Sequence, residues 1–201
     1  VRQFPGFEQS EAEPVSGDAS FRRYFRVWQH ANQATAPGNG VPFIVMDAPP
    51  EHEDCEPFVA IARHWHHQGI AVPESIQADL KQGFLLLEDF GDQLMLGQLT
   101  ADSADQLYRK ALEELTLIAR QPSPEDYPLR PYDATLLERE MALFPDWLLE
   151  RHLGMRLENS ERALLDSTFS ILRESALAQP EVTVHRDYHS RNLLVRPNEP
   201  R

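Results

Sequence analysis

The sequence is poor in cysteine and in long apolar runs, and each shortage excludes a class of protein. Cys55 is the only cysteine among the 201 residues, so an intramolecular disulfide and a zinc site built on cysteines are both excluded. No apolar segment approaches the roughly 20 residues that a membrane-spanning helix needs. The first residues do not show the basic stretch and apolar run of a secretory signal. These absences predict a cytoplasmic protein with no membrane partner.

Basic side chains are also scarce. The chain carries 19 lysines and arginines against 32 aspartates and glutamates, which gives a formal net charge of −13. Only two of the basic residues are lysines, Lys81 and Lys110. Non-specific binding to nucleic acid needs a basic surface, so we expect no nucleic-acid partner. A nucleotide needs only a local group of hydrogen-bond donors, and the acidic balance is compatible with that.

The hydrophobic periodicity changes from that of strands to that of helices near residue 89. Alternating or short apolar runs predict four strands, at residues 21–28, 43–46, 72–77 and 83–87. Helical spacing predicts four helices, at residues 56–68, 104–120, 134–149 and 158–178. Two more short strands are expected at 182–184 and 193–195. This order predicts an α+β fold, and no feature indicates an obligate protein partner.

The most specific motif is His185-Arg186-Asp187, followed by four residues and then Asn192. It matches H-R-D-x-x-x-x-N, the catalytic loop of kinases, and an ordinary polar turn would not require these identities. In such a loop the aspartate accepts or orients the proton of the attacking hydroxyl, and the asparagine oxygen holds Mg²⁺ against the nucleotide phosphates. We therefore predict Asp187 as catalytic base and Asn192 as magnesium ligand, with His185 and Arg186 supporting the loop.

The second histidine of this loop, His189, gives a pattern that resembles the aminoglycoside phosphotransferase and choline kinase superfamily. Further blocks resemble the bacterial anomeric kinases of N-acetylmuramate and N-acetylglucosamine, at residues 16–26, 43–50, 85–91, 137–140 and 144–147. The resemblance implies a two-lobed, protein-kinase-like fold, with a nucleotide-binding lobe at 1–88 and a helical lobe at 89–201. It also implies phosphoryl transfer from ATP, with Mg²⁺, to a small amino sugar in cell-wall sugar recycling.

The resemblance further implies a nucleotide site in the first lobe. Ser16, Gly17 and Ser20 would lie in the loop over the phosphates, where backbone N–H groups and hydroxyls can donate hydrogen bonds. With a single glycine, the same segment is also compatible with a plain hairpin turn. The backbone at Glu88 and Phe90 would form the hinge beside adenine, in a segment that also has the composition of a buried strand.

The chain departs from the kinase pattern in two places. Kinases carry a lysine on the third strand that pairs with the phosphates, and residues 44–47 contain none. We hypothesise that Arg22, Arg23 or Arg26 supplies this charge, with Arg23 as the predicted contact; the alternative is a solvated strand face. The resemblance also implies a later aspartate as a second metal ligand. The sequence ends at Arg201, so we expect the metal site of this chain by itself to be incomplete.

The acceptor is predicted from the resemblance and from residue chemistry. Sugars need carboxylates for their hydroxyls and often an aromatic face, which Asp146 and Trp147 would supply together with His189. The alternative for Asp146 and Trp147 is a solvated helix stripe with the ring in the core. An aminoglycoside- or choline-type kinase is a second possibility, since an acidic protein suits a cationic acceptor. A non-catalytic nucleotide-binding pseudokinase is the third, because the third-strand lysine is missing.

Overall fold

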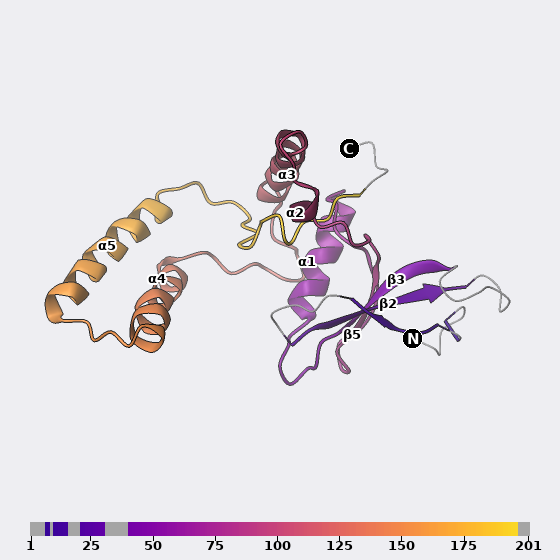
Figure 1. Ribbon diagram of the computed structural model, residues 1–201, viewed down its shortest axis with the longest axis horizontal. Coiled ribbons are helices and arrows are strands. Elements are labelled where there is room, and N and C mark those ends of the chain that lie inside the picture. The colour runs from indigo at the N-terminus through magenta and orange to yellow at the C-terminus, as the bar shows by residue number, and fades with distance from the viewer. Residues whose placement is uncertain (1–6, 9, 16–20, 31–39, 197–201) are drawn as a thin grey trace. The chain divides into compact units, whose positions relative to one another are not determined.

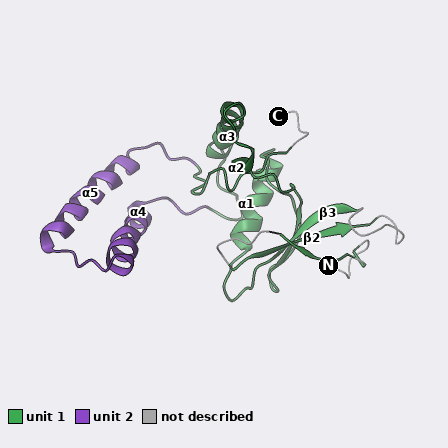
Figure 2. Ribbon diagram, in the orientation of Figure 1, with its two compact units in different colours: residues 1–128, 183–201 green, residues 129–182 purple. Residues whose placement is uncertain are grey.

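The computed structural model describes residues 7–8, 10–15, 21–30 and 40–196. The predicted phosphate-loop residues Ser16, Gly17 and Ser20 lie outside the described residues. The chain forms two compact units (Figure 2): unit 1 comprises residues 1–128 and 183–201, and unit 2 comprises residues 129–182. The predicted division into functional lobes at residue 88 stays a prediction.

Unit 1 is built on an antiparallel sheet with the strand order β1-β2-β3-β5-β4 (Figure 1). The strands are β1 (Glu13–Pro14), β2 (Arg23–Gln29), β3 (Val41–Asp47), β4 (Ser75–Asp79) and β5 (Phe84–Glu88). The four predicted strands at 21–28, 43–46, 72–77 and 83–87 are confirmed with shifted ends, and β1 is an additional short strand. The sheet and the helices together confirm the expected α+β class.

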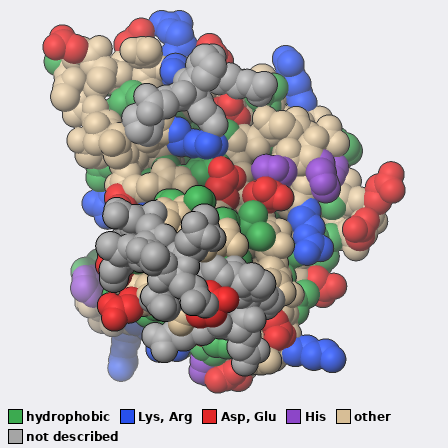
Figure 3. Space-filling model, turned by 90° about the vertical axis from the view of Figure 1, so that its right-hand side faces the viewer, with side chains coloured by type: hydrophobic (Ala, Val, Ile, Leu, Met, Phe, Trp, Pro, Cys, Tyr) green, Lys and Arg blue, Asp and Glu red, His purple; other side chains and the backbone are tan. Residues whose placement is uncertain are grey.

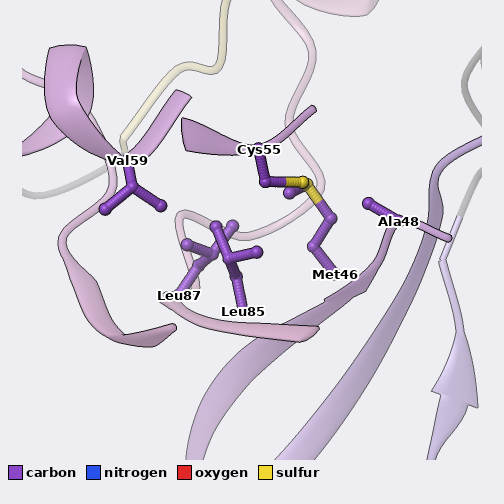
Figure 4. Packing of buried hydrophobic residues seen from close by; sticks show 6 residues of the cluster. All are labelled: Met46, Ala48, Cys55, Val59, Leu85 and Leu87. Carbon is purple, nitrogen blue, oxygen red and sulfur yellow. The ribbon is translucent and has the colours of Figure 1, made fainter. Parts of the chain in front are cut away.

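The two faces of the sheet bury different side chains, as the alternation of a strand requires. One face packs against α1 (Glu56–His67) and forms the larger cluster (Figure 4), which comprises Met46, Ala48, Cys55, Val59, Leu85 and Leu87. Met46 is 0% exposed and Leu85 is 1% exposed. The opposite face holds a smaller cluster of Phe7, Val27 and Val45. Each fully buried aliphatic side chain contributes about 1.5–3 kcal/mol to stability.

The helices predicted at 56–68, 104–120 and 158–178 are confirmed with small shifts of their ends. Unit 1 contains α1, the short α2 (Met95–Gln98) and α3 (Ala104–Ala119), and unit 2 contains α4 (Ala134–Leu143), η1 (Phe144–His152) and α5 (Asn159–Leu177). A capping box between Glu158 and Glu161 starts α5. Within the described part of the chain, no helix is long and apolar enough to cross a membrane.

Pro145 interrupts the third predicted helix, as its position indicates. Proline has no N–H to donate to the carbonyl four residues earlier, so the α-helical pattern cannot continue through it. The α-helix accordingly ends at Leu143, and the wider π-helical pattern of η1 carries the chain on to His152. The single predicted helix at 134–149 is therefore two segments of different hydrogen bonding.

The two strands predicted around the polar loop were a wrong expectation. Residues 182–184 form no strand, and the segment 193–195 makes only an isolated antiparallel bridge between Leu94 and Leu194. The apolar run in 193–195 thus pairs with the chain just before α2 instead of with its predicted partner. The Leu193 carbonyl and the Val195 N–H both make backbone hydrogen bonds to residues 93–95, so these groups do not need a hairpin partner.

Candidate active site

The motif segment is anchored by backbone hydrogen bonds to the start of α2. The N–H of Met95 donates to the carbonyl of Leu193 at 2.8 Å, and the N–H of Leu96 donates to the carbonyl of Ser190 at 2.9 Å. The N–H of Val195 donates to the carbonyl of Gln93 at 2.7 Å. These bonds hold both the polar loop and its apolar continuation against residues 93–96, which follow the predicted hinge directly in the chain.

Asp187 is held by the two polar residues that the motif places after it. The Asn192 amide nitrogen donates to Asp187 Oδ2 at 2.7 Å and to the Asp187 carbonyl at 3.0 Å. His189 Nε2 lies 3.0 Å from Asp187 Oδ1. The side chain of Asp187 is nevertheless 72% exposed. The carboxylate is therefore oriented from within the loop and still accessible to an incoming hydroxyl.

The tautomer of His189 follows from its neighbours. The N–H of Arg191 donates to His189 Nδ1 at 3.2 Å, so Nδ1 acts as an acceptor and carries no hydrogen. In the neutral imidazole the hydrogen then lies on Nε2, which is the nitrogen that faces Asp187. His189 thus donates a hydrogen bond to the carboxylate, and the loop supplies one donor to each carboxylate oxygen.

His185 supports the loop through packing. Its ring is half-buried, stacks on Trp65 of α1 at a centroid distance of 6.1 Å, and meets Tyr188 edge-on at 5.1 Å. Tyr188 in turn donates its hydroxyl hydrogen to the carbonyl of Ala111 at 2.6 Å. Burial lowers the pKa of His185, which opposes and outweighs the attraction of Asp187 for the charged form. The motif histidine therefore connects the loop to α1 and α3 as a mainly neutral ring.

Arg186 has a left-handed backbone conformation, with φ of 72°. Residues other than glycine seldom adopt this backbone conformation, which costs of order 1–3 kcal/mol. Such strain persists where the surroundings hold it, and here it turns the chain between His185, which packs inward, and Asp187, which is exposed. The supporting roles of His185 and Arg186 are consistent with these positions.

At the predicted hinge, the backbone N–H of Glu88 is hydrogen-bonded within the protein and that of Phe90 has no acceptor among the described residues. The N–H of Glu88 donates to the carbonyl of Glu74 at 3.0 Å, and its carboxylate accepts from the Glu74 N–H at 3.2 Å. The guanidinium of Arg196 lies 4.2 Å from the centroid of the Phe90 ring. Within the described ranges, no residue accepts a hydrogen bond from the Phe90 N–H. Phe90 therefore has an amide with which to meet an adenine, whereas the Glu88 amide is used in the sheet.

Two of the candidate arginines, Arg22 and Arg23, lie on opposite faces of the sheet. Arg22 lies on the α1 side, with its guanidinium 5.9 Å from the Phe58 ring and Nε 3.0 Å from a carboxylate oxygen of Glu53. Burial disfavours its charge, yet the interactions with Tyr24 and Glu53 outweigh that cost and raise the pKa of Arg22. Arg23 lies on the other face, is 66% exposed and pairs with Asp47. The predicted contact of Arg23 with nucleotide stays a prediction.

Arg26, the third candidate, shares the α1-facing side with Arg22 and forms the most extensive ion pair of the sheet. Its guanidinium donates to both oxygens of Asp89 and to both oxygens of Asp92. These hydrogen bonds, to Asp92 above all, raise the pKa of Arg26 well above its ordinary value. In Figure 3, acidic and basic side chains lie next to one another on the face shown, in keeping with pairing of this kind.

The residues of the loop fit Mg²⁺ by the chemistry of their donors. The amide nitrogen of Asn192 is engaged with Asp187, which leaves the amide oxygen, a hard ligand that suits Mg²⁺, for a metal ion. Among the described residues, no group of three or more His, Cys, Asp or Glu side chains is arranged to hold a metal. Mg²⁺ tolerates such a sparse set because it keeps water and phosphate oxygens as its other ligands.

The predicted acceptor residues Asp146 and Trp147 lie on η1 in unit 2. Trp147 is 56% exposed, so it is not the core residue of the alternative interpretation. The guanidinium of Arg151, one π-helical turn later, lies 4.2 Å from the centroid of its indole ring. Asp146 is exposed in the first turn of η1. Their part in binding a sugar stays a prediction, as does that of His189, which is engaged with Asp187.

Sequence reasoning missed several residues that surround these groups: Glu53, Trp65, Asp89, Asp92 and Arg196. Trp65 belongs to the apolar pattern of the helix predicted at 56–68, and the other four residues lie in polar segments outside the helices and strands. Their partners are distant in sequence, and no local spacing signals such contacts. The arginine-rich strand was the one available hint, since several buried or half-buried cations in an acidic protein require carboxylate partners.

Comparison with known proteins identifies relatives over most of the chain. The profile of the "Phosphotransferase enzyme family" matches residues 11–201. Proteins named N-acetylmuramate/N-acetylglucosamine kinase are 45% identical over 191 residues in Pseudomonas aeruginosa (95% of this chain, 53% of the relative) and 46% identical over 180 residues in Pseudomonas putida (90% and 50%). A protein of the same name from Neisseria meningitidis is 32% identical over 188 residues (92% and 53%). The chain spans about half the length of these relatives.

Proposed function

Because this chain belongs to the phosphotransferase enzyme family, we propose that it contributes the catalytic loop of an ATP- and magnesium-dependent amino-sugar kinase. The proposed reaction transfers the γ-phosphoryl group of ATP to the anomeric hydroxyl of N-acetylmuramate or N-acetylglucosamine. The names of the relatives at 45% and 46% identity support this acceptor over an aminoglycoside or choline. We place the reaction in the cytoplasm, where ATP is available, and within the recycling of cell-wall sugars.

The observation that carries the proposal is the orientation of the Asp187 carboxylate. His189 and Asn192 each donate to a different oxygen of this group, at 3.0 and 2.7 Å. Two donors fix the plane of the carboxylate and leave each oxygen a further lone pair for a hydroxyl proton. A group that receives a proton during transfer needs this combination of fixed direction and access.

In the proposed mechanism Asp187 accepts the hydroxyl proton while the hydroxyl oxygen bonds to the γ-phosphorus and the bond to the ADP oxygen breaks. The Asn192 amide oxygen would hold Mg²⁺, which would neutralise charge on the phosphate oxygens. The His189 N–H keeps the carboxylate turned toward the acceptor. The Phe90 N–H would donate to adenine, and Trp147 and Asp146 keep their predicted role in binding the sugar. The residues of the phosphate loop, Ser16, Gly17 and Ser20, keep their predicted role.

The proposal is tested by a phosphoryl-transfer assay on the protein at its full natural length, with ATP and Mg²⁺. The acceptors are N-acetylmuramate, N-acetylglucosamine, choline and an aminoglycoside. The Asp187→Asn variant keeps the shape of the side chain and removes the base, so kcat on the amino sugars should fall by about 10²–10⁴-fold. Asp126→Asn makes the same chemical change at an exposed residue of the connector after α3 and should leave kcat unchanged.

The other outcomes have distinct meanings. Turnover of choline or the aminoglycoside alone would reassign the acceptor and retain the base. Binding of ATP with no turnover of any acceptor would favour the pseudokinase alternative. Equal kcat for Asp187→Asn and the wild type would contradict the mechanism directly.

A further inference from the structure

Arg26 joins the middle of the sheet to the turn that follows the hinge. It lies on β2, opposite Ile44 of β3, and its guanidinium forms two forks. One fork grips Asp89, with Nη2 3.1 Å from Oδ1 and Nε bonded to Oδ2. The second fork grips Asp92, with both N–O distances at 2.8 Å. One guanidinium thus donates hydrogen bonds to two carboxylates that are three residues apart in the sequence.

The two forks differ in how deeply their carboxylates are buried. The side chain of Asp89 is 3% exposed and that of Arg26 is 18% exposed, whereas Asp92 is 65% exposed. Asp89 Oδ1 also accepts the N–H of Gly91 at 2.8 Å. The Asp89 carboxylate therefore holds the backbone one residue after Phe90, and Arg26 holds that carboxylate from the sheet. Phe90 lies between the two points that this network fixes.

From this geometry we propose that Arg26 is a positioning residue for recognition of the nucleobase, an inference that rests on the proposed function. By clamping Asp89 and Asp92, it fixes the direction of the Phe90 N–H. Adenine presents an acceptor at N1 to a donor in this position, whereas guanine presents an N–H there. A donor with a fixed direction forms a hydrogen bond with adenine and meets a second donor on guanine. A well-held turn therefore favours binding of adenine over guanine.

A consequence concerns the missing third-strand lysine. In Arg26 the two carboxylate forks use four of the five guanidinium N–H donors and both edges that could hold a phosphate bidentately. Arg26 thereby acts at the hinge end of the sheet, next to the predicted adenine site. Arg22 and Arg23 are also paired, with Glu53 and Asp47, and Arg26 differs from them in holding two carboxylates at the turn after the hinge.

The experiment measures direct binding of ADP and GDP by calorimetry, with the protein at its full natural length. Arg26→Lys keeps one positive charge beside the buried Asp89 but cannot form two forks. We expect its Kd for ADP to rise by about tenfold, as expected when charge-assisted bidentate bonds are replaced by a point charge. The Kd for GDP should change much less, so that the preference for ADP falls by a similar factor.

A matched control and a milder variant complete the design. Arg109→Lys makes the same substitution at an exposed ion pair of unit 1, where Nη2 of Arg109 contacts both carboxylate oxygens of Asp105 on α3, and should bind both nucleotides like the wild type. Asp92→Asn weakens only the exposed fork. It should reduce the ADP preference by a smaller factor even if Arg26→Lys fails to fold.

The outcomes separate this inference from the proposed function. Unchanged Kd values for Arg26→Lys, or an equal loss for ADP and GDP, would overturn the positioning role while nucleotide binding by the wild type stands. If Arg26→Lys is unfolded, an unchanged ADP preference in Asp92→Asn would overturn it. A wild-type protein that binds neither nucleotide would overturn the proposed function and this inference with it.

Discussion

Unit 1 has a buried core and unit 2 has none. In unit 1, the sheet and α1 enclose Met46 and Leu85, which are 0% and 1% exposed. In unit 2, all of which is described, no residue of α4, η1 or α5 is buried. Leu164 and Ile171 of α5 are both 67% exposed. Both regions carry apolar residues at regular spacing. Regular spacing thus selects the secondary structure, while burial depends on how many neighbours the fold brings to the apolar side.

The ion pairs and polar contacts of the two units also differ in their burial. The polar groups of unit 1 form networks that involve buried or half-buried members, such as Arg26 with Asp89 and His185 with Trp65. The ion pairs of unit 2, Arg162 with Glu150 and Arg173 with Glu138, lie between largely exposed side chains. Exposed pairs of this kind typically contribute only about 0–1 kcal/mol to stability.

The largest expected effect comes from truncating one leucine in each unit. Leu85→Ala removes a fully buried side chain and should lower the free energy of unfolding by about 2–5 kcal/mol. Leu164→Ala makes the same change on exposed α5 and should stay within about 0.5 kcal/mol of the wild type. Urea denaturation of both variants measures the difference. Similar losses at the two positions would show that the apolar side of α5 is covered in solution.

A smaller effect is expected at the turn between β4 and β5. Gly83 has φ of +76°, and a Cβ there would lie 2.0 Å from the Ala48 carbonyl oxygen. Gly83→Ala should therefore destabilise unit 1 by about 1–3 kcal/mol. Gly97 of α2 has open space around its Cβ direction, so Gly97→Ala should stabilise by about 0.4–1 kcal/mol. Thermal unfolding of both variants, with opposite shifts of Tm, is the measurement.

The smallest effect concerns the pH dependence of stability in unit 1. Burial lowers the pKa of His185 in the folded protein below the ordinary value near 6.5, so the unfolded chain binds the proton more readily. His185 therefore costs stability as the pH falls below about 6.5, and this cost disappears at higher pH. Replacing it by glutamine should flatten the stability profile between about pH 5 and 7. A profile as steep as that of the wild type would locate the titration elsewhere.

Much of the fold and part of the site could be predicted from local pattern alone. The alternation in residues 21–28 predicts a strand because successive side chains point to opposite faces, and β2 confirms it. Asp187, His189 and Asn192 come together because they lie within six residues of one loop, so their spacing is nearly their geometry. The strand expected at 182–184 failed because an apolar run forms a strand only where a partner strand is available.

Local sequence is enough to predict the face on which each arginine of β2 lies and the groups of the catalytic loop, since both follow from separations of a few residues. The carboxylates that meet those arginines, in contrast, are known only from the three-dimensional fold. Asp89 and Asp92 are 63 and 66 residues away from Arg26, and Trp65 meets His185 across an even longer stretch of chain. Contacts at such separations depend on strand order and on the packing of α1, which no local spacing encodes.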